Sequence, residues 1–325
     1  MNALLTRAVR HARHALIATA SLLALTAPVQ AENFKIMIGA NPGGGFDQTG
    51  RGIGKALQDA GAAKNVSYEN RGGAGGTIGL AQFVNASKGD PNALVVMGAV
   101  MVGAIVQNKP PVTLENATPV ARLFTEYNVF VVPANSPFKT MREVVEQMKK
   151  DPASVKWGGG SKGSVDHISV AMIARAAGVD VARANYIPFR GGGEASAAIL
   201  GGHVTVGTAG YAEFAEFIRT GKVRAIAVTS PQRLASAKDI PTLREQGLDV
   251  EIGNWRGVYG APGITPDQRK ALVAAVTKAT STPGWKEALQ KNDWTPSLLT
   301  GDDFGRFVSD EHARLRALMV KSGML

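Results

Sequence analysis

Residues 34–60 read FKIMIGANPGGGFDQTGRGIGKALQDA and contain the pattern from which the fold is predicted. The apolar run Phe34–Ile38 predicts a buried strand, and apolar residues recur from 53 to 60 at the spacing of one helix face. Between them lies PGGGFD (42–47), where glycine lets the backbone turn tightly and approach a ligand. A strand, a glycine-rich loop and a helix in this order are typical of α/β proteins that bind ligands at the carboxyl ends of their strands.

Three more glycine-rich loops follow predicted strands, with the sequences RGGAGG (71–76), GGGSKGS (158–164) and RGGGE (190–194). Helical patterns lie between the strands; one of them, from Met141, is preceded by a predicted capping box of Thr140 and Glu143. This alternation predicts parallel sheets with right-handed crossovers. The predicted strands are Phe34–Ile38, Val66–Glu69, Ala93–Met97, Val120–Val132, Ser154–Trp157, Ala184–Ile187, Val204–Val206 and Val223–Val228.

Two segments are candidate crossings between lobes. PANSP (133–137) breaks a long apolar strand, and GNWRG (253–257) precedes another. The expected organisation is a first lobe of residues 32–133 with 253–325 and a second lobe of residues 134–252. Two crossings form a hinge with a cleft that closes on a ligand. A single larger α/β domain is the alternative.

The composition excludes several classes of protein. The 325 residues are 45% hydrophobic, as in globular proteins, and contain no cysteine, which rules out disulfides, iron–sulfur clusters, thiolate zinc sites and a cysteine nucleophile. Five histidines make a weak case for a metal, and no cofactor is expected. Three of the ten net positive charges lie in residues 1–31, and the remaining +7 is spread along the chain with few aromatic neighbours, so a nucleic-acid partner is not expected.

The first 31 residues have the pattern of a signal peptide. Arg7, Arg10 and Arg13 form a basic region, and an apolar run too short for a stable membrane anchor follows. The triplet Val29–Ala31 is a typical cleavage site, so we expect cleavage after Ala31 and a soluble, periplasmic mature protein that is a monomer. An uncleaved anchor is the alternative.

The glycine loops favour a small anion as the ligand, because helix N-termini offer free N–H groups and a positive dipole end. The Walker A pattern fails because Ser164 stands at the lysine position, and no loop matches the dinucleotide fingerprint. A small carboxylate remains the better candidate.

A serine hydrolase is the enzymatic alternative. Residues 159–163, GGSKG, match the G-x-S-x-G pattern around Ser161. His312, after one of several aspartates, would complete the order Ser–acid–His. We expect no catalysis, because His312 lies in a charged helical stretch and no oxyanion segment precedes Ser161.

Several single residues have two interpretations each. Asp47 either contacts an ammonium group of the ligand or caps the following helix. His167 and Arg190 either reach the ligand or face solvent, and Phe46 and Phe189 either wall the pocket or pack in the core. The four tryptophans, Trp157, Trp255, Trp285 and Trp294, are expected to be structural.

Taken in order, these motifs resemble one known family. The export signal, ANPGGGFD (40–47), NRGGAGG (70–76), PFRGGG (188–193), IPTLREQG (240–247) and WRGV (255–258) are similar to those of the periplasmic receptors of tripartite tricarboxylate transporters, also called Bordetella uptake gene receptors.

The resemblance implies a two-lobed Venus-flytrap fold and a membrane partner of one large and one small subunit. It also implies that loop amides bind a carboxylate, partly through water. The implied binding residues are Gly44, Gly45, Phe46 and Asp47 in the first lobe and Ser161, Ser164, Gly191, Gly192 and Gly193 in the second.

The sequence departs from the family pattern at two places. Phe189 and Arg190 replace a frequent tyrosine and lysine, so a hydroxyl contact is lost. Phe46 replaces a frequent serine, or the tryptophan of the tricarboxylate-binding branch, and this favours a citrate-like di- or tricarboxylate. The expected function is capture of such a ligand for an importer; a periplasmic sensor that signals to a kinase is the alternative.

Overall fold

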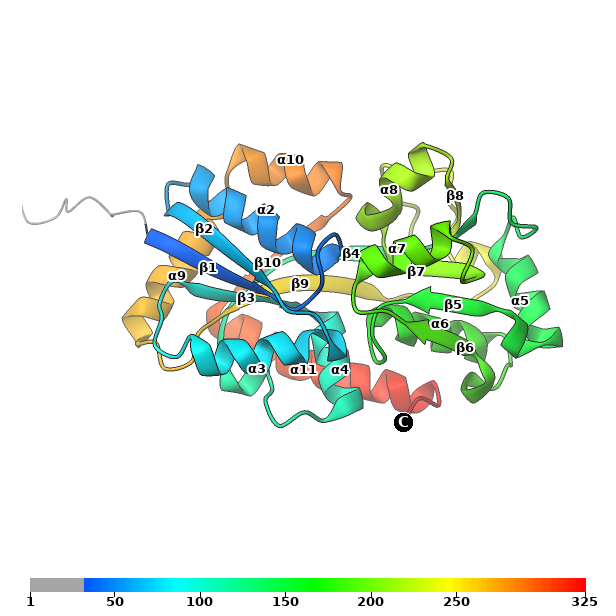
Figure 1. Ribbon diagram of the computed structural model, residues 1–325, viewed down its shortest axis with the longest axis horizontal. Helices are drawn as coiled ribbons and strands as arrows, with labels where there is room; N and C mark the ends of the chain where they lie inside the picture. The colour runs from blue at the N-terminus through cyan, green and yellow to red at the C-terminus, as the bar shows by residue number, and fades with distance from the viewer. Residues whose placement is uncertain (1–31) are drawn as a thin grey trace, which may run out of the picture. The chain divides into compact units, whose positions relative to one another are not determined.

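Strands and helices alternate along residues 32–325, the part of the chain that the computed structural model describes (Figure 1). The strands are β1 (Glu32–Ile38), β2 (Ala63–Asn70), β3 (Ala93–Gly98), β4 (Thr118–Pro133), β5 (Lys156–Gly159), β6 (Asn185–Pro188), β7 (Val206–Gly210), β8 (Val223–Val228), β9 (Gly253–Gly260) and β10 (Thr295–Thr300). The helices are α2 (Gly45–Asp59), α3 (Thr77–Ala86), α4 (Ala99–Asn108), α5 (Met141–Lys150), α6 (Val165–Ala176), α7 (Gly192–Leu200), α8 (Tyr211–Arg219), α9 (Pro266–Ala279), α10 (Pro283–Lys291) and α11 (Gly301–Lys321). The predicted signal peptide and its cleavage site lie outside the described residues.

The strands form a mixed sheet in the order β2-β1-β3-β9-β4-β7-β5-β6, and β10 and β8 both pair with β4. Strands β1, β2 and β3 are parallel, and so are β5, β6 and β7. The expectation of parallel sheets is wrong for the centre, where β9 and β4 run antiparallel to each other and to their outer neighbours. The reason is that the chain leaves β1–β3 along β4 and returns along β9 in the opposite direction, so that β9 lies between β3 and β4.

The long strand β4 is shared between two sets of partners. Its first part pairs with β9 and β10, and its last part, from Asn128, pairs with β7 and β8. Figure 1 shows β4 and β9 side by side between the two groups of parallel strands. The alternation of side chains along β4 places Phe130 and Val132 on one face and Val129 and Val131 on the other.

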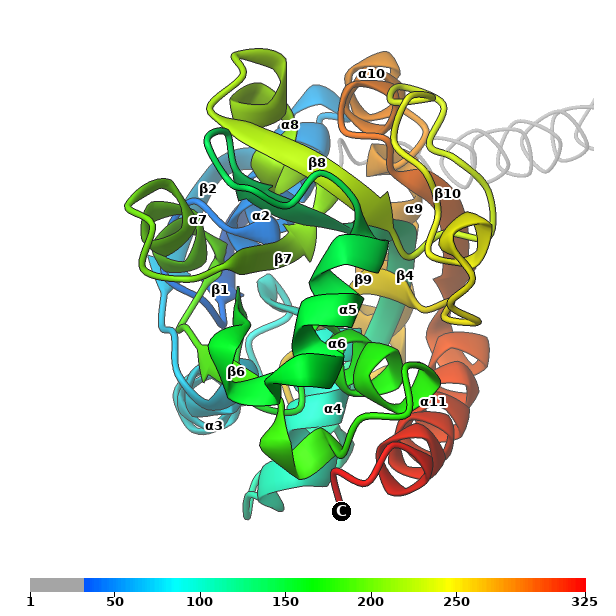
Figure 2. The ribbon, with the colours of Figure 1, turned by 90° about the vertical axis from the view of Figure 1, so that its right-hand side faces the viewer.

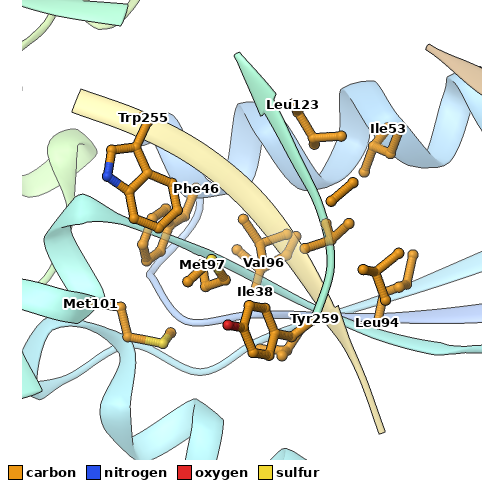
Figure 3. Close-up of a cluster of buried hydrophobic side chains, with 14 of the residues drawn as sticks. Ile38, Phe46, Ile53, Leu94, Val96, Met97, Met101, Leu123, Trp255 and Tyr259 are labelled. Carbon is orange, nitrogen blue, oxygen red and sulfur yellow. The ribbon is translucent and has the colours of Figure 1, made fainter. Parts of the chain in front are cut away.

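Buried apolar side chains form three clusters. The first cluster draws on β1–β3, β9 and the helices α2, α4, α9 and α11; Figure 3 shows Ile38, Val96 and Tyr259 from its neighbouring strands β1, β3 and β9. The other two clusters lie on opposite faces of β4 and β7, with α5 and α6 covering one face and α7 and α8 the other (Figure 2). The predicted lobe limits, 134 and 252, remain a prediction.

A local sequence signal explains where α5 begins. The predicted capping box before α5 is present, because Thr140 accepts a hydrogen bond from the N–H of Glu143, whose carboxylate accepts one from the N–H of Thr140.

Other predictions from the sequence had mixed outcomes. All four tryptophans are buried, as expected. The predicted strand Val204–Val206 lies too early, since β7 begins at Val206, and β10 was not predicted because TPSLLT lacks a period-two apolar pattern. Within residues 32–325, none of the helices has the length and apolar character needed to cross a bilayer.

We expect Phe124 of β4 to be a key residue for stability. Its ring stacks on Trp294, with centroids 4.0 Å apart, and contacts Trp285 at 6.1 Å. Phe124→Ala should lower the free energy of unfolding by about 3–5 kcal/mol in urea denaturation, because it leaves a cavity beneath two indoles. The control is Leu298→Ala on β10, whose side chain is 44% exposed and whose loss should cost under about 0.5 kcal/mol. Equal effects of the two changes would contradict this assignment.

Candidate functional site

All four glycine-rich loops contribute to the wall of a small cavity of about 50 Å³; the loop after β2 contributes Gly75, and the other three, the first, second and third loops in chain order, contribute more. It has room for about three to five water molecules. Eight of the twelve predicted site residues line it, namely Gly44, Gly45, Phe46, Ser161, Phe189, Arg190, Gly191 and Gly192. Asp47, Ser164, His167 and Gly193 do not line it. The remaining lining residues are Gly39, Ala40, Gly75, Val100, Gly160, Asp166, Ala209, Glu213, Asn254 and Arg256.

The first loop ends at the N-terminus of α2, where Gly44 is the N-cap and has no capping side chain. Asp47 is the third residue of α2, so its predicted role as N-cap is wrong. Its carboxylate accepts hydrogen bonds from the N–H of Gly43 at 3.1 Å, from Arg51 at 3.0 Å and from Asn70 at 3.0 Å. Burial raises the pKa of Asp47, but these bonds outweigh burial and hold it below its usual value. Asp47 therefore stabilises the conformation of the first loop and does not line the cavity.

The second loop lies between β5 and α6. Its conformation is stabilised by Ser164 and His167, neither of which lines the cavity. Ser164 caps α6 by accepting from the N–H of His167, and the imidazole Nδ1 of His167 accepts from the N–H of Gly163 at 3.1 Å. His167 stacks on Tyr186, and burial followed by the charge of Lys162 lowers its pKa to about 4. His167 is therefore neutral at pH 7 and supports the loop, which neither of its predicted interpretations described.

The third loop precedes α7 and touches the first loop directly. Gly192 and Gly44 are so close that a Cβ on Gly44 would lie 2.8 Å from the backbone nitrogen of Gly192. The amide of Asn41 donates to Glu194 at 2.5 Å, which ties the two loops on the exposed side. Phe189 is half-buried and Arg190 exposed at the cavity rim. The N-termini of α2 and α7 therefore both open onto one space.

A buried ion pair lies against the cavity. Arg256 of β9 donates to Glu126 of β4 from Nε at 2.8 Å and from Nη2 at 2.5 Å, and both side chains are less than 5% exposed. The guanidinium also lies over the ring of Phe46, 4.9 Å from its centroid. The second oxygen of Glu126, Oε2, has no hydrogen-bond partner. Arg256 thus forms part of the cavity wall and is held there by Glu126.

A chain of side-chain hydrogen bonds runs from Asn254 of β9, two residues before Arg256, to Asp166 of α6. Buried Asp166 accepts from the N–H of Gly160 at 2.7 Å and from the amide of Asn128, whose oxygen in turn accepts from Asn254 at 3.3 Å. Because a carboxylate can only accept, this order fixes both amides and leaves Oδ1 of Asn254 without a partner at the cavity. Burial raises the pKa of Asp166.

Glu213, from the first turn of α8, completes the group of charges. Its carboxylate accepts from the N–H of Gly210 at 3.3 Å and lies beside Gly44, Gly45 and Gly192. Burial, together with the charges of Glu126 and Asp166, raises the pKa of Glu213 to about 8, although Arg256 acts in the opposite direction. This carboxyl group is therefore mostly protonated at pH 7.

Sequence reasoning missed Glu126, Asp166, Glu213, Asn254 and Arg256. A signal existed for two of them, because Glu126 and Arg256 are charged residues inside predominantly apolar stretches of sequence, and such residues are rarely buried without a partner. Nothing in the sequence shows that residues 126 and 256 meet. Glu213 had the weakest signal, since an acidic residue in the first turn of a helix is commonplace.

The predicted hydrolase alternative finds no support in this geometry. The hydroxyl oxygen of Ser161 accepts from the N–H of Gly75 at 2.9 Å, which links the second loop to the loop after β2. His312 lines a different cavity, between α4 and α11. Among residues 32–325, no group of three His, Cys, Asp or Glu side chains is arranged to hold a metal ion.

Residues 51–324 match the family model described as "Tripartite tricarboxylate transporter family receptor". Protein BugT of Bordetella pertussis is 28% identical over 316 residues, covering 94% of this chain and 95% of BugT.

Solved structures agree with this match. A TctC solute-binding protein from Polaromonas, without ligand, is 29% identical, with a TM-score of 0.62 over 91% of this chain and 100% of that one. MatC from Rhodopseudomonas palustris, solved with bound malate, is 24% identical, with a TM-score of 0.77 over 88% of this chain and 98% of that one. The α/β fold predicted from the sequence is confirmed as that of periplasmic binding proteins.

The ion pair leads to a prediction about stability. Arg256→Gln should lower the free energy of unfolding by about 3–5 kcal/mol, because Glu126 would be left charged and buried without its partner. The double variant Glu126→Gln/Arg256→Gln should recover most of this loss, since it removes both charges. Denaturant unfolding is measured for four ligand-free proteins: the unmodified chain, Arg256→Gln, Glu126→Gln and the double variant. A double variant that loses as much as the two single changes together would contradict the coupling.

Proposed function

This chain belongs to the family of tripartite tricarboxylate transporter receptors, and from that premise we propose that it captures a small di- or tricarboxylate in the periplasm and delivers it to a transporter. In this proposal residues 1–31 direct export and are removed after Ala31. The membrane partner consists of one large and one small subunit. Binding involves no covalent chemistry.

The observation that carries the proposal is the convergence of two helix N-termini on one cavity. The first N–H groups of α2 and α7 have no partner within their own helix, and each helix dipole adds positive potential at that end. Carboxylates bind well at such positions, because charge-assisted hydrogen bonds contribute about 1.5–3 kcal/mol each. Gly44, Gly45, Gly191 and Gly192, at the start of these two helices, all line the cavity.

The size and lining of the cavity favour a small aliphatic ligand. At about 50 Å³ it favours a compact acid over an aromatic one. Phe46, under the guanidinium of Arg256, forms an apolar wall that suits a short carbon chain. MatC, a protein of the same fold, was solved with malate, which belongs to the proposed ligand class.

Titration calorimetry of residues 32–325 tests the proposal. The panel contains citrate, tricarballylate, succinate, malate, glutamate and an aromatic acid. We expect at least one of the aliphatic acids to bind with a Kd in the micromolar range, near −8 kcal/mol, and the aromatic acid to bind more weakly. The proposal fails if none of these acids binds.

Gly44→Ala tests the role of the glycine loops. Its φ of −97° suits any residue, but a Cβ would lie 2.8 Å from the backbone nitrogen of Gly192, so the two loops could not approach as they do here. We expect at least about a tenfold loss of affinity, or about 1.4 kcal/mol, with little change in the melting temperature of the ligand-free protein.

The matched control is Gly52→Ala in the same helix. A Cβ at Gly52 would lie 3.5 Å from Trp285, an ordinary contact, so this variant should bind like the unmodified chain. If Gly44→Ala lowers stability as much as affinity, Gly44 serves the fold rather than the ligand.

A further inference from the structure

The carboxyl group of Glu213 lies where both ligand-binding helices begin. Its Oε2 would overlap a Cβ placed on Gly192 and would lie 3.3 Å from one on Gly44, while its Oε1 would lie 3.0 Å from one on Gly45. These glycines line the cavity together with Glu213 itself. The side chain is therefore within reach of any carboxylate that binds at the N-termini of α2 and α7.

The charges that face Glu213 come from several elements and are mostly negative. Glu126 of β4 and Asp166 of α6 disfavour a further negative charge, and Arg256 of β9 opposes them. Arg256 is already engaged with Glu126, and Arg190, before α7, is exposed at the rim. The N–H groups of Gly45, at the start of α2, and of Gly210, just before α8, also favour a charged Glu213. A second carboxylate brought by the ligand would increase the repulsion further.

We propose that Glu213 is a ligand-binding residue that carries a proton in the loaded receptor and donates its O–H to a carboxylate oxygen of the ligand. The inference rests on the proposed function, which supplies the carboxylate. Two carboxyl groups within hydrogen-bond distance commonly share one proton. Capture at alkaline pH then takes up one proton onto Glu213 Oε1 or Oε2 from solvent, and the ligand itself stays ionised.

The pH dependence follows from the raised pKa of Glu213, about 8 in the free protein. Below that pH the group already holds the proton, so affinity is constant. Above it, the proton has to be added on binding, so affinity falls. The Kd should rise about tenfold between pH 7 and pH 9.

Calorimetry with malate over this pH range tests the proposal, because malate is almost fully ionised from pH 7 upward; citrate serves as a second ligand from pH 8 upward, where it is also almost fully ionised. Glu213→Gln keeps a donor of the same shape but does not titrate, so its affinity should change less than about twofold over the range. The control, Glu216→Gln, removes an exposed carboxylate of the same helix that pairs with Arg219 and should keep the full tenfold change.

A second measurement needs only the unmodified protein. Repeating the titration at pH 8.5 in buffers of different ionisation enthalpy gives the number of protons taken up per ligand. We expect roughly three quarters of a proton, and none for Glu213→Gln.

Three results would overturn the inference: no proton uptake by the unmodified protein, the same pH dependence in Glu213→Gln, or tighter binding by Glu213→Gln at every pH. The last result would mean that Glu213 competes with the ligand for the helix N-termini. Failure of every acid to bind at pH 7 would instead refute the proposed function.

Discussion

The ion pair between Glu126 and Arg256 is the interaction on which the site depends. It joins β4 to β9, the two strands that connect the groups of parallel strands, and it is buried below the glycine loops. The position of Arg256 requires glycine at 45, because a Cβ there would overlap Nη2. Glu126 likewise requires glycine at position 210, because a Cβ there would overlap its carboxylate; Gly210 is the N-cap of α8, which carries Glu213. One pair of charges thus determines which residues fit at two of the surrounding turns.

The sequence predicted the local parts of this structure well and the long-range parts poorly. The four glycine-rich loops follow strands and precede helical turns, as expected, because glycine and apolar periodicity are local signals. The sheet was predicted as parallel, since the sequence does not show that β9 returns beside β4. For Asp47 the error was small in position but large in role: three residues beyond the N-cap, its carboxylate accepts a hydrogen bond from the loop residue Gly43 and does not line the cavity.

The residues of the candidate site show the same difference between local and long-range signals. Backbone donors were predictable from the glycine clusters, because a loop before a helix has free N–H groups wherever it occurs. The charged side chains were not, since Glu126 and Arg256 are 130 positions apart and Glu213 gains its importance only from those neighbours. The chain carries a net charge of +10, yet three of the side chains grouped around the cavity are acidic. Overall charge therefore says little about the electrostatics of the site.

The continuity of β4 has a mechanical consequence. This strand runs without a break from the first buried cluster, where it pairs with β9, to the other two clusters, where it pairs with β7 and β8. A displacement of the first cluster relative to the others would have to bend or twist β4 and strain its hydrogen bonds on both sides. The backbone of this one strand therefore opposes such a displacement elastically.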